Sequence, residues 1–71
     1  MSEEEKEIED LVKHFLTGTI NENVRKQLID NLAAYGNKAI EPIHRCISDP
    51  SIQNEELKIY ALDTIKRIKE S

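Results

Sequence analysis

Two stretches of the chain decide its fold: VRKQLIDNLAAY at residues 24–35 and LKIYALDTIKRI at residues 57–68. Each stretch begins with an apolar residue and a basic one. Leu or Ala, an apolar residue and Asp follow in the middle, and two further apolar positions come at the end. The second stretch begins 33 residues after the first, at position 57 against position 24. Self-similarity at such a period indicates a stacked-repeat architecture. Repeat proteins of this kind present surfaces to other macromolecules, so the pattern predicts an interaction protein.

Length and composition place the chain in a narrow class. It has 71 residues, 38% hydrophobic and 34% charged, with only two Gly and two Pro, which suits one small helical domain over residues 1–71. No apolar run approaches the roughly 20 residues of a membrane span, and the acidic N-terminus does not resemble a signal peptide. The single cysteine fits a reducing compartment. We therefore expect a cytoplasmic protein.

The net charge of −4 is concentrated at the N-terminus. Residues 1–10 carry six acids and one lysine, a net charge of −5, so the remaining residues sum to +1. Carboxylates at a helix start interact favourably with the helix dipole, which predicts that this run opens a solvated helix. A docking tail for a basic partner is the alternative interpretation.

Helical periodicity predicts two helices in the first half of the chain. The first runs from about Ser2, a plausible N-cap, to Leu16, and Thr17-Gly18-Thr19 ends it. The second starts near Asn21 and stops at Gly36-Asn37. Their predicted core positions are Ile8, Leu11, Val12, Phe15 and Leu16 in the first helix, and Val24, Leu28, Leu32 and Tyr35 in the second.

Two further helices are predicted in the second half. The third begins around residues 38–40, because Pro42 is tolerated only in a first turn, and it ends at Asp49-Pro50. The fourth follows a polar turn at residues 51–54 and runs from Glu55 to about Lys69. Its predicted core positions are Leu57, Ala61, Ile65 and Ile68, and those of the third helix are Ile40, Ile43, Cys46 and Ile47. Short loops predict antiparallel hairpins.

Residues 24–68 resemble HEAT repeats of the short, lyase-like type. The matching elements are Val24-Arg25 and Tyr35-Gly36 at the ends of one helix, Ala39-Ile40-x-Pro42-Ile43 at the start of the next, Asp49-Pro50 at its end, and Leu57-Lys58 where the pattern begins again. The resemblance implies an all-α fold of four antiparallel helices, arranged as two stacked HEAT-like hairpins in a short α-solenoid. It also implies that Arg25 and Asp49 hold the two units in register. A compact four-helix bundle shares the same binary pattern and is the alternative.

The side chains that could carry chemistry are few and scattered. His44 and Cys46 are two residues apart on a helix, so they point to different faces and cannot share a metal ion. Cys46 lies on the apolar stripe as a small core residue, whereas His14 and His44 occupy polar positions. No phosphate-binding loop, zinc-helix motif or nucleophile elbow is present. We expect no enzyme activity, no cofactor, no metal ion and no small-molecule substrate.

The two repeats differ where function is most expected. Ile59 stands against Lys26 and Tyr60 against Gln27, and Leu62 lies beside the core cluster of its helix. The fourth helix is therefore apolar over more of its circumference than the second, although a terminal solenoid helix should have a polar outer face. We expect Ile59, Tyr60, Leu62 and Lys66 to bind a larger protein partner or a second copy of the chain. The alternative is that Ile59 and Tyr60 are isolated exposed apolar residues, which are common.

Direct nucleic-acid binding is the rival function. Lys66, Arg67 and Lys69 cluster on the last helix, but cations near a helix C-terminus are already explained by the helix dipole. The chain is acidic and only 4% aromatic, so phosphate-driven affinity should be weak. The sequence favours a non-enzymatic accessory subunit that binds and stabilises a larger protein. A nucleic-acid enzyme such as a DNA polymerase is one such partner.

Overall fold

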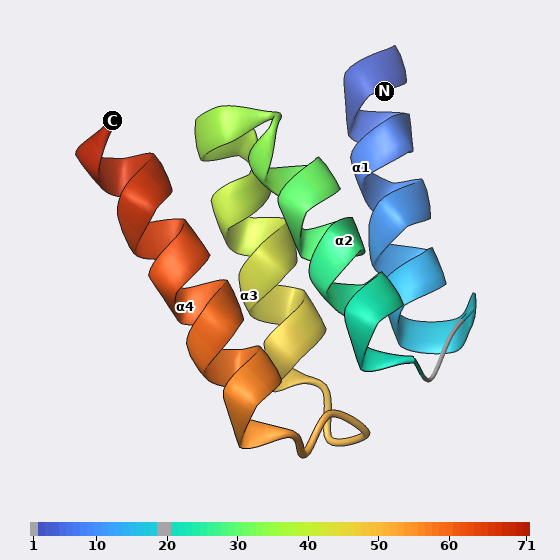
Figure 1. The fold of residues 1–71 in the computed structure, drawn as a ribbon. Coiled ribbons are helices and arrows are strands. Elements are labelled where there is room, and N and C mark those ends of the chain that lie inside the picture. The colour runs from blue at the N-terminus through green and yellow to red at the C-terminus, as the bar shows by residue number, and fades with distance from the viewer. Residues whose placement is uncertain (1, 19–20) are drawn as a thin grey trace.

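Four α-helices, running alternately down and up, make up the computed structural model, which describes residues 2–18 and 21–71 (Figure 1). The helices are α1 (Glu3–Lys13), α2 (Glu22–Ala33), α3 (Ile40–Ser48) and α4 (Glu55–Glu70). A π-helical turn at His14–Gly18 extends α1, and a 3₁₀ turn at Gly36–Ala39 leads into α3. The described part of the chain contains no strand. The expected all-α fold of four antiparallel helices is confirmed.

Polar side chains begin three of the helices at the positions expected from the sequence. Ser2 accepts a hydrogen bond from the Glu5 N–H at 3.2 Å, and Asn21 accepts from the N–H groups of residues 23 and 24. Asn54 accepts from the Leu57 N–H at 3.0 Å and so caps α4. These side chains satisfy backbone donors that a helix start leaves unpaired. After α2, Gly36 takes a φ of +68°, which reverses the chain before α3.

The structure differs from the expected boundaries at the end of the first helix. The first helix was predicted to run to Leu16, but its α-helical part ends at Lys13 and the chain continues as the π-helical turn. The Thr17 hydroxyl donates to the Lys13 carbonyl at 2.7 Å, a side-chain bond that competes with the helical ladder. Thr19, part of the predicted stop signal, lies outside the described residues. The third helix begins at Ile40, which places Pro42 in its first turn as expected.

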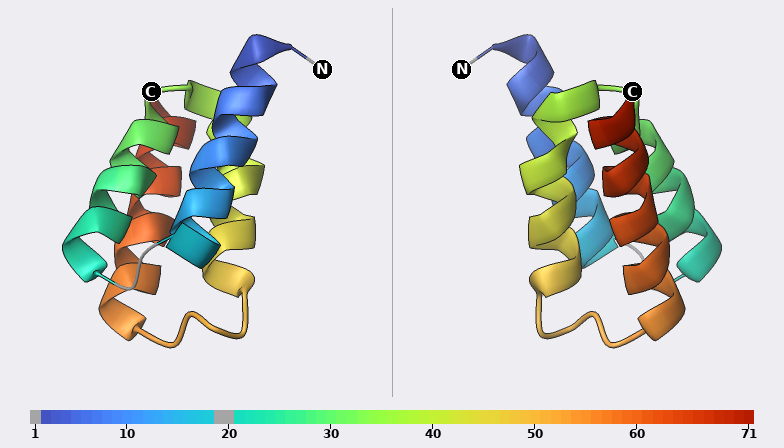
Figure 2. Two further views of the ribbon diagram at one scale, coloured as in Figure 1. Left: turned by 90° about the vertical axis from the view of Figure 1, so that its right-hand side faces the viewer. Right: turned by 90° about the vertical axis from the view of Figure 1, so that its left-hand side faces the viewer.

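The helices form two layers. α1 packs on α2 and α3, and α4 also packs on α2 and α3, so α1 and α4 are the outer helices. Two views at right angles to the first show α1 beside α3 in one layer and α2 beside α4 in the other (Figure 2). The two helices of each layer run in the same direction. The Cα radius of gyration is 11.2 Å, close to the ~11 Å of a compact fold of this length.

One hydrophobic core lies between the layers. Its largest fully buried side chains come from the π-helical turn, from α2, α3 and α4, and from one loop: Phe15, Ile29, Leu32, Ile43, Cys46, Ile52 and Leu57. Most predicted core positions are buried, while Leu11, Leu16, Val24, Tyr35, Ile40 and Ile68 are only partly buried at its edge. Ile29, Ala39 and Ile52 are buried in addition to the predicted positions. Ile52 enters the core from the α3–α4 loop, where the sequence predicts a polar turn at residues 51–54.

Arg25 and Asp49 do not form the link between units that the family resemblance implies. The Arg25 guanidinium lies over the Phe15 ring, 5.4 Å from its centroid, and Arg25 Nε is buried without a hydrogen-bond partner. Asp49 instead accepts from the backbone N–H and the hydroxyl of Ser51, which lowers the pKa of its carboxyl. The contacts between the two hairpins are made by other side chains, described below.

Candidate interaction surface

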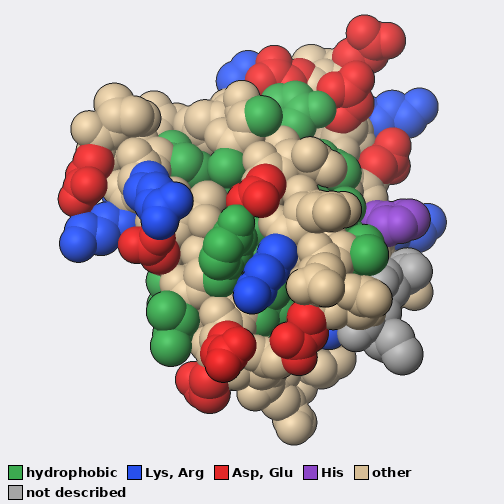
Figure 3. All heavy atoms as spheres, in the orientation of Figure 1, with side chains coloured by type: hydrophobic (Ala, Val, Ile, Leu, Met, Phe, Trp, Pro, Cys, Tyr) green, Lys and Arg blue, Asp and Glu red, His purple; other side chains and the backbone are tan. Residues whose placement is uncertain are grey.

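The outer face of α4 carries the most exposed large apolar side chains of the described residues. Ile59 is 63% exposed and Leu62 is 48% exposed. Lys66 is exposed one turn further on, and Glu55 is exposed one turn before Ile59. We call these four residues the α4 stripe. Their spacing of four, three and four places them along one side of the helix. On the α4 side of the molecule, hydrophobic side chains reach the surface among charged ones (Figure 3).

The equivalent side of α2 packs in large part against the second hairpin. Moving the α4 stripe back by 33 residues gives Glu22, Lys26, Ile29 and Ala33. Glu22 accepts a hydrogen bond from the Asn54 amide, and the Lys26 ammonium lies over the Tyr60 ring, 5.6 Å from its centroid. Ile29, which corresponds to Leu62, is fully buried. The α4 stripe therefore occupies the position at which the first hairpin receives the second.

Tyr60 lies apart from the other predicted contact residues. Its hydroxyl donates to Asp30 Oδ1 at 2.6 Å, so the side chain packs on α2 and is half-buried. This hydrogen bond to a carboxylate raises the pKa of Tyr60. The structure thus brings Ile59, Leu62 and Lys66 onto one face, whereas Tyr60 joins the two hairpins. Glu55 was not among the predicted contact residues, although its spacing from Ile59 would have placed it on the stripe.

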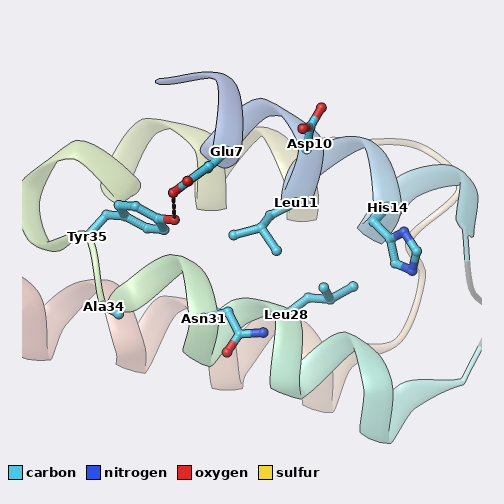
Figure 4. A pocket seen from close by; sticks show the side chains of 8 residues that line it. All are labelled: Glu7, Asp10, Leu11, His14, Leu28, Asn31, Ala34 and Tyr35. Atoms are coloured by element: carbon cyan, nitrogen blue, oxygen red, sulfur yellow. Dashed lines mark hydrogen bonds between the residues drawn. The ribbon is translucent and has the colours of Figure 1, made fainter. Parts of the chain in front are cut away.

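A groove of about 650 Å³ runs between α1 and α2 on another side of the molecule (Figure 4). Leu11 of α1 and Leu28 of α2 face each other across it, and Asp10 and His14 lie along the α1 rim. Tyr35 closes one end, where its hydroxyl donates to Glu7 Oε2 at 2.6 Å. The hydrogen bond to this carboxylate raises the pKa of Tyr35. The rim of this groove is polar and its floor is apolar, but the Glu7 carboxylate at its end already accepts the hydrogen bond from Tyr35.

The three side chains considered for chemistry are separated. Cys46 is fully buried in the core, as predicted, and burial raises the pKa of its thiol to about 11. His14 is exposed at the groove, while His44 is half-buried on α3. Among residues 2–18 and 21–71, no three His, Cys, Asp or Glu side chains gather closely enough to hold a metal ion. None of the described helices is long and apolar enough to cross a membrane.

Comparisons of the chain with protein-family models, with curated proteins and with solved structures found no match. The likeness to HEAT repeats therefore rests on the residues quoted for it alone.

Proposed function

We propose that this chain is a non-enzymatic protein-interaction module that binds a larger protein through the α4 stripe and acts as its small accessory subunit. One observation carries the proposal. The stripe is exposed on α4, whereas among the residues 33 positions earlier Ile29 is fully buried and Lys26 and Ala33 are half-buried. In a stacked-repeat fold, the end of the stack is normally capped by a polar face. An apolar end with Ile59 and Leu62 at its centre is a surface on which a partner would stack.

The expected gain from covering this surface is moderate. Burying the exposed parts of Ile59 and Leu62 would contribute about 1–2 kcal/mol each, on the usual scale for aliphatic side chains. A stable complex therefore needs contacts beyond these two residues, with Lys66 and Glu55 at the rim to set orientation. In this proposal the partner is a larger protein, such as a nucleic-acid enzyme like a DNA polymerase, and the chain itself needs no basic face.

The charges of the molecule support this function over direct nucleic-acid binding. Arg67 is paired with Asp63 at 2.7 Å, Lys38 with Glu4 at 3.1 Å, and Arg45 with Glu9. Cations already paired with carboxylates have less to gain from phosphates, and the chain as a whole carries −4.

Affinity capture from native lysate tests the proposal. Wild-type bait is compared with Leu62→Glu, which places a charge in the stripe, and with Gln27→Glu, which adds the same charge at an exposed position of α2. We expect one defined larger protein with the wild type and with Gln27→Glu, and its loss with Leu62→Glu. Equal capture by all three baits, or a gel shift of DNA that weakens steeply with salt, would count against the proposal.

A further inference from the structure

The charges at the two ends of the α4 stripe are opposite. Glu55 lies at its N-terminal end, Lys66 lies at its C-terminal end, and the apolar residues Ile59 and Leu62 stand between them. Spacings of four, three and four are those of alternating seam positions in a heptad, the pattern by which helices pack in pairs. The stripe is thus a short seam with an acidic end and a basic end.

This order is complementary to itself when reversed. If a second α4 is laid antiparallel on the first, with the centre between residues 60 and 61, Ile59 of one copy meets Leu62 of the other. In the same register, Glu55 meets Lys66, and two-fold symmetry makes each contact twice. A parallel arrangement would instead place Glu55 beside Glu55 and Lys66 beside Lys66, which repel each other. The charges therefore select the antiparallel arrangement.

We propose that the α4 stripe binds the α4 stripe of a second copy of this chain, in an antiparallel dimer. This inference goes beyond the proposed function, since it assigns to the same surface a second occupant, which a larger partner would displace. α4 is an outer helix, and its free side faces away from α2 and α3 (Figure 2). Asp63, which flanks the stripe, is already paired with Arg67 at 2.7 Å and brings no uncompensated charge to the seam. An isologous contact of this kind closes at two copies and does not continue into a filament.

The dimer is expected to be weak. Four side chains on one helix bury much less than the ~1,200–2,000 Å² of a standard stable interface. We therefore expect association with a dissociation constant on the order of 100 µM, so that dimer forms at high concentration and dissociates on dilution.

Sedimentation equilibrium of the purified chain at up to about 1 mM tests the dimer. Wild type should show a concentration-dependent dimer, and Ile59→Glu should weaken association at least tenfold. Glu55→Lys and Lys66→Glu should each weaken association about tenfold, because each leaves like charges facing across the seam. An equimolar mixture of these two single variants should regain dimer, and so should the double variant Glu55→Lys/Lys66→Glu. Gln27→Glu serves as the surface control, and circular dichroism checks that each variant is folded.

Two results would overturn the inference: a wild type that remains monomeric at every concentration, or charge variants that associate as well alone as when mixed. The proposed function is tested separately by the capture experiment. A monomeric chain whose captured protein is lost with Leu62→Glu would refute the dimer and leave the proposed function standing. Unchanged capture by Leu62→Glu together with a charge-dependent dimer would refute the proposed function and support the dimer.

Discussion

Tyr60 shows how one residue can serve the fold at a position where the sequence suggested a binding site. Its hydroxyl reaches Asp30 at 2.6 Å, and its ring lies beneath the Lys26 ammonium, so both ends of the side chain contact α2. Ile59, the next residue back, points outward and is 63% exposed. Adjacent residues on a helix differ by about 100°, which is enough to separate a structural contact from a free one.

The Tyr60 hydrogen bond should be visible in the dependence of stability on pH. Tyr60→Phe keeps the ring but removes the bond, and we expect a loss of about 0.5–1 kcal/mol in urea denaturation at pH 7, since the site is only half-buried. Because the folded pKa of Tyr60 is raised above 10.0, its stabilising contribution is present below pH 10 and is lost as the pH rises through the raised pKa. Tyr60→Phe should lose less unfolding free energy than wild type above pH 10. An identical decrease in the two proteins would show that the hydrogen bond to Asp30 does not stabilise the fold.

Cys46 should be unreactive in the folded protein. It is fully buried and its thiol pKa is raised to about 11, so both access and the thiolate population are reduced. At pH 8 we expect a thiol reagent to label it at least about 100-fold more slowly than in the same protein unfolded by urea. The unfolded sample provides the control, because it contains the same single cysteine. Rapid labelling without denaturant would show that this part of the core opens readily.

At the scale of the helix, Asn54 connects the start of α4 to the start of α2. Its side-chain oxygen accepts from the Leu57 N–H, and its amide nitrogen donates to Glu22. Asn54→Ala removes both bonds and should lower the free energy of unfolding by about 1–2 kcal/mol. Glu22→Ala removes the bond between helices and the acid in the first turn of α2 but keeps the cap of α4, and it should cost clearly less. Urea denaturation of the two variants measures the difference, and an equal cost would mean that the cap itself contributes nothing.

The elements that the sequence predicted well are those defined by local signals. Ser2, Asn21 and Asn54 mark helix starts because capping depends on residues only two or three positions away. Pro42 and Gly36 set boundaries through their own backbone preferences. The buried position of Ile52 and the full burial of Ile29 depend instead on how the second hairpin folds back onto the first. No local pattern encodes that packing.

The α4 stripe also combines features that local sequence signals predict with features that depend on distant parts of the chain. Ile59 could be selected because it replaces Lys26 in the repeat comparison, and Leu62 because it lies beside the core cluster of its helix. The helical period places Tyr60 about 100° from Ile59, but its contact with Asp30 could not be predicted, because Asp30 lies 30 positions earlier in the sequence. Glu55 attracts attention only after its companions are seen to share one exposed face.

For the molecule as a whole, the acidic N-terminal run does more than favour a helix start. Three carboxylates of α1 reach side chains elsewhere in the fold. Glu4 pairs with Lys38 at 3.1 Å, Glu7 accepts from Tyr35, and Glu9 binds Arg45 of α3. α1 is an outer helix, so these contacts hold it against the rest of the molecule. The interpretation of the run as a solvated helix start missed these contacts, since their partners come from distant parts of the chain.

The contact between Glu9 and Arg45 should make the stability of the protein sensitive to acid. The hydrogen bond and charge of Arg45 lower the pKa of Glu9 from its ordinary value of 4.5. A lowered carboxyl pKa stabilises the fold above the unfolded-state value, and this contribution is lost as the pH falls through the folded-state pKa. Arg45→Met should therefore show a smaller drop in unfolding free energy below about pH 4.5 than wild type, with only a small change at pH 7, because the pair is exposed.

Arg67→Met provides the matched control for the acid experiment, because it changes the net charge equally but leaves the contact between Glu9 and Arg45 intact. Thermal denaturation followed by circular dichroism between pH 2 and pH 7 gives the comparison. The Asp49 contact with Ser51 is present in all three proteins, so even Arg45→Met should retain some acid sensitivity. If Arg45→Met and Arg67→Met lose stability in acid to the same extent, the contact between Glu9 and Arg45 does not contribute to the loss of stability at low pH. In that case the apolar contacts of Ile8 and Val12 hold the helix in place.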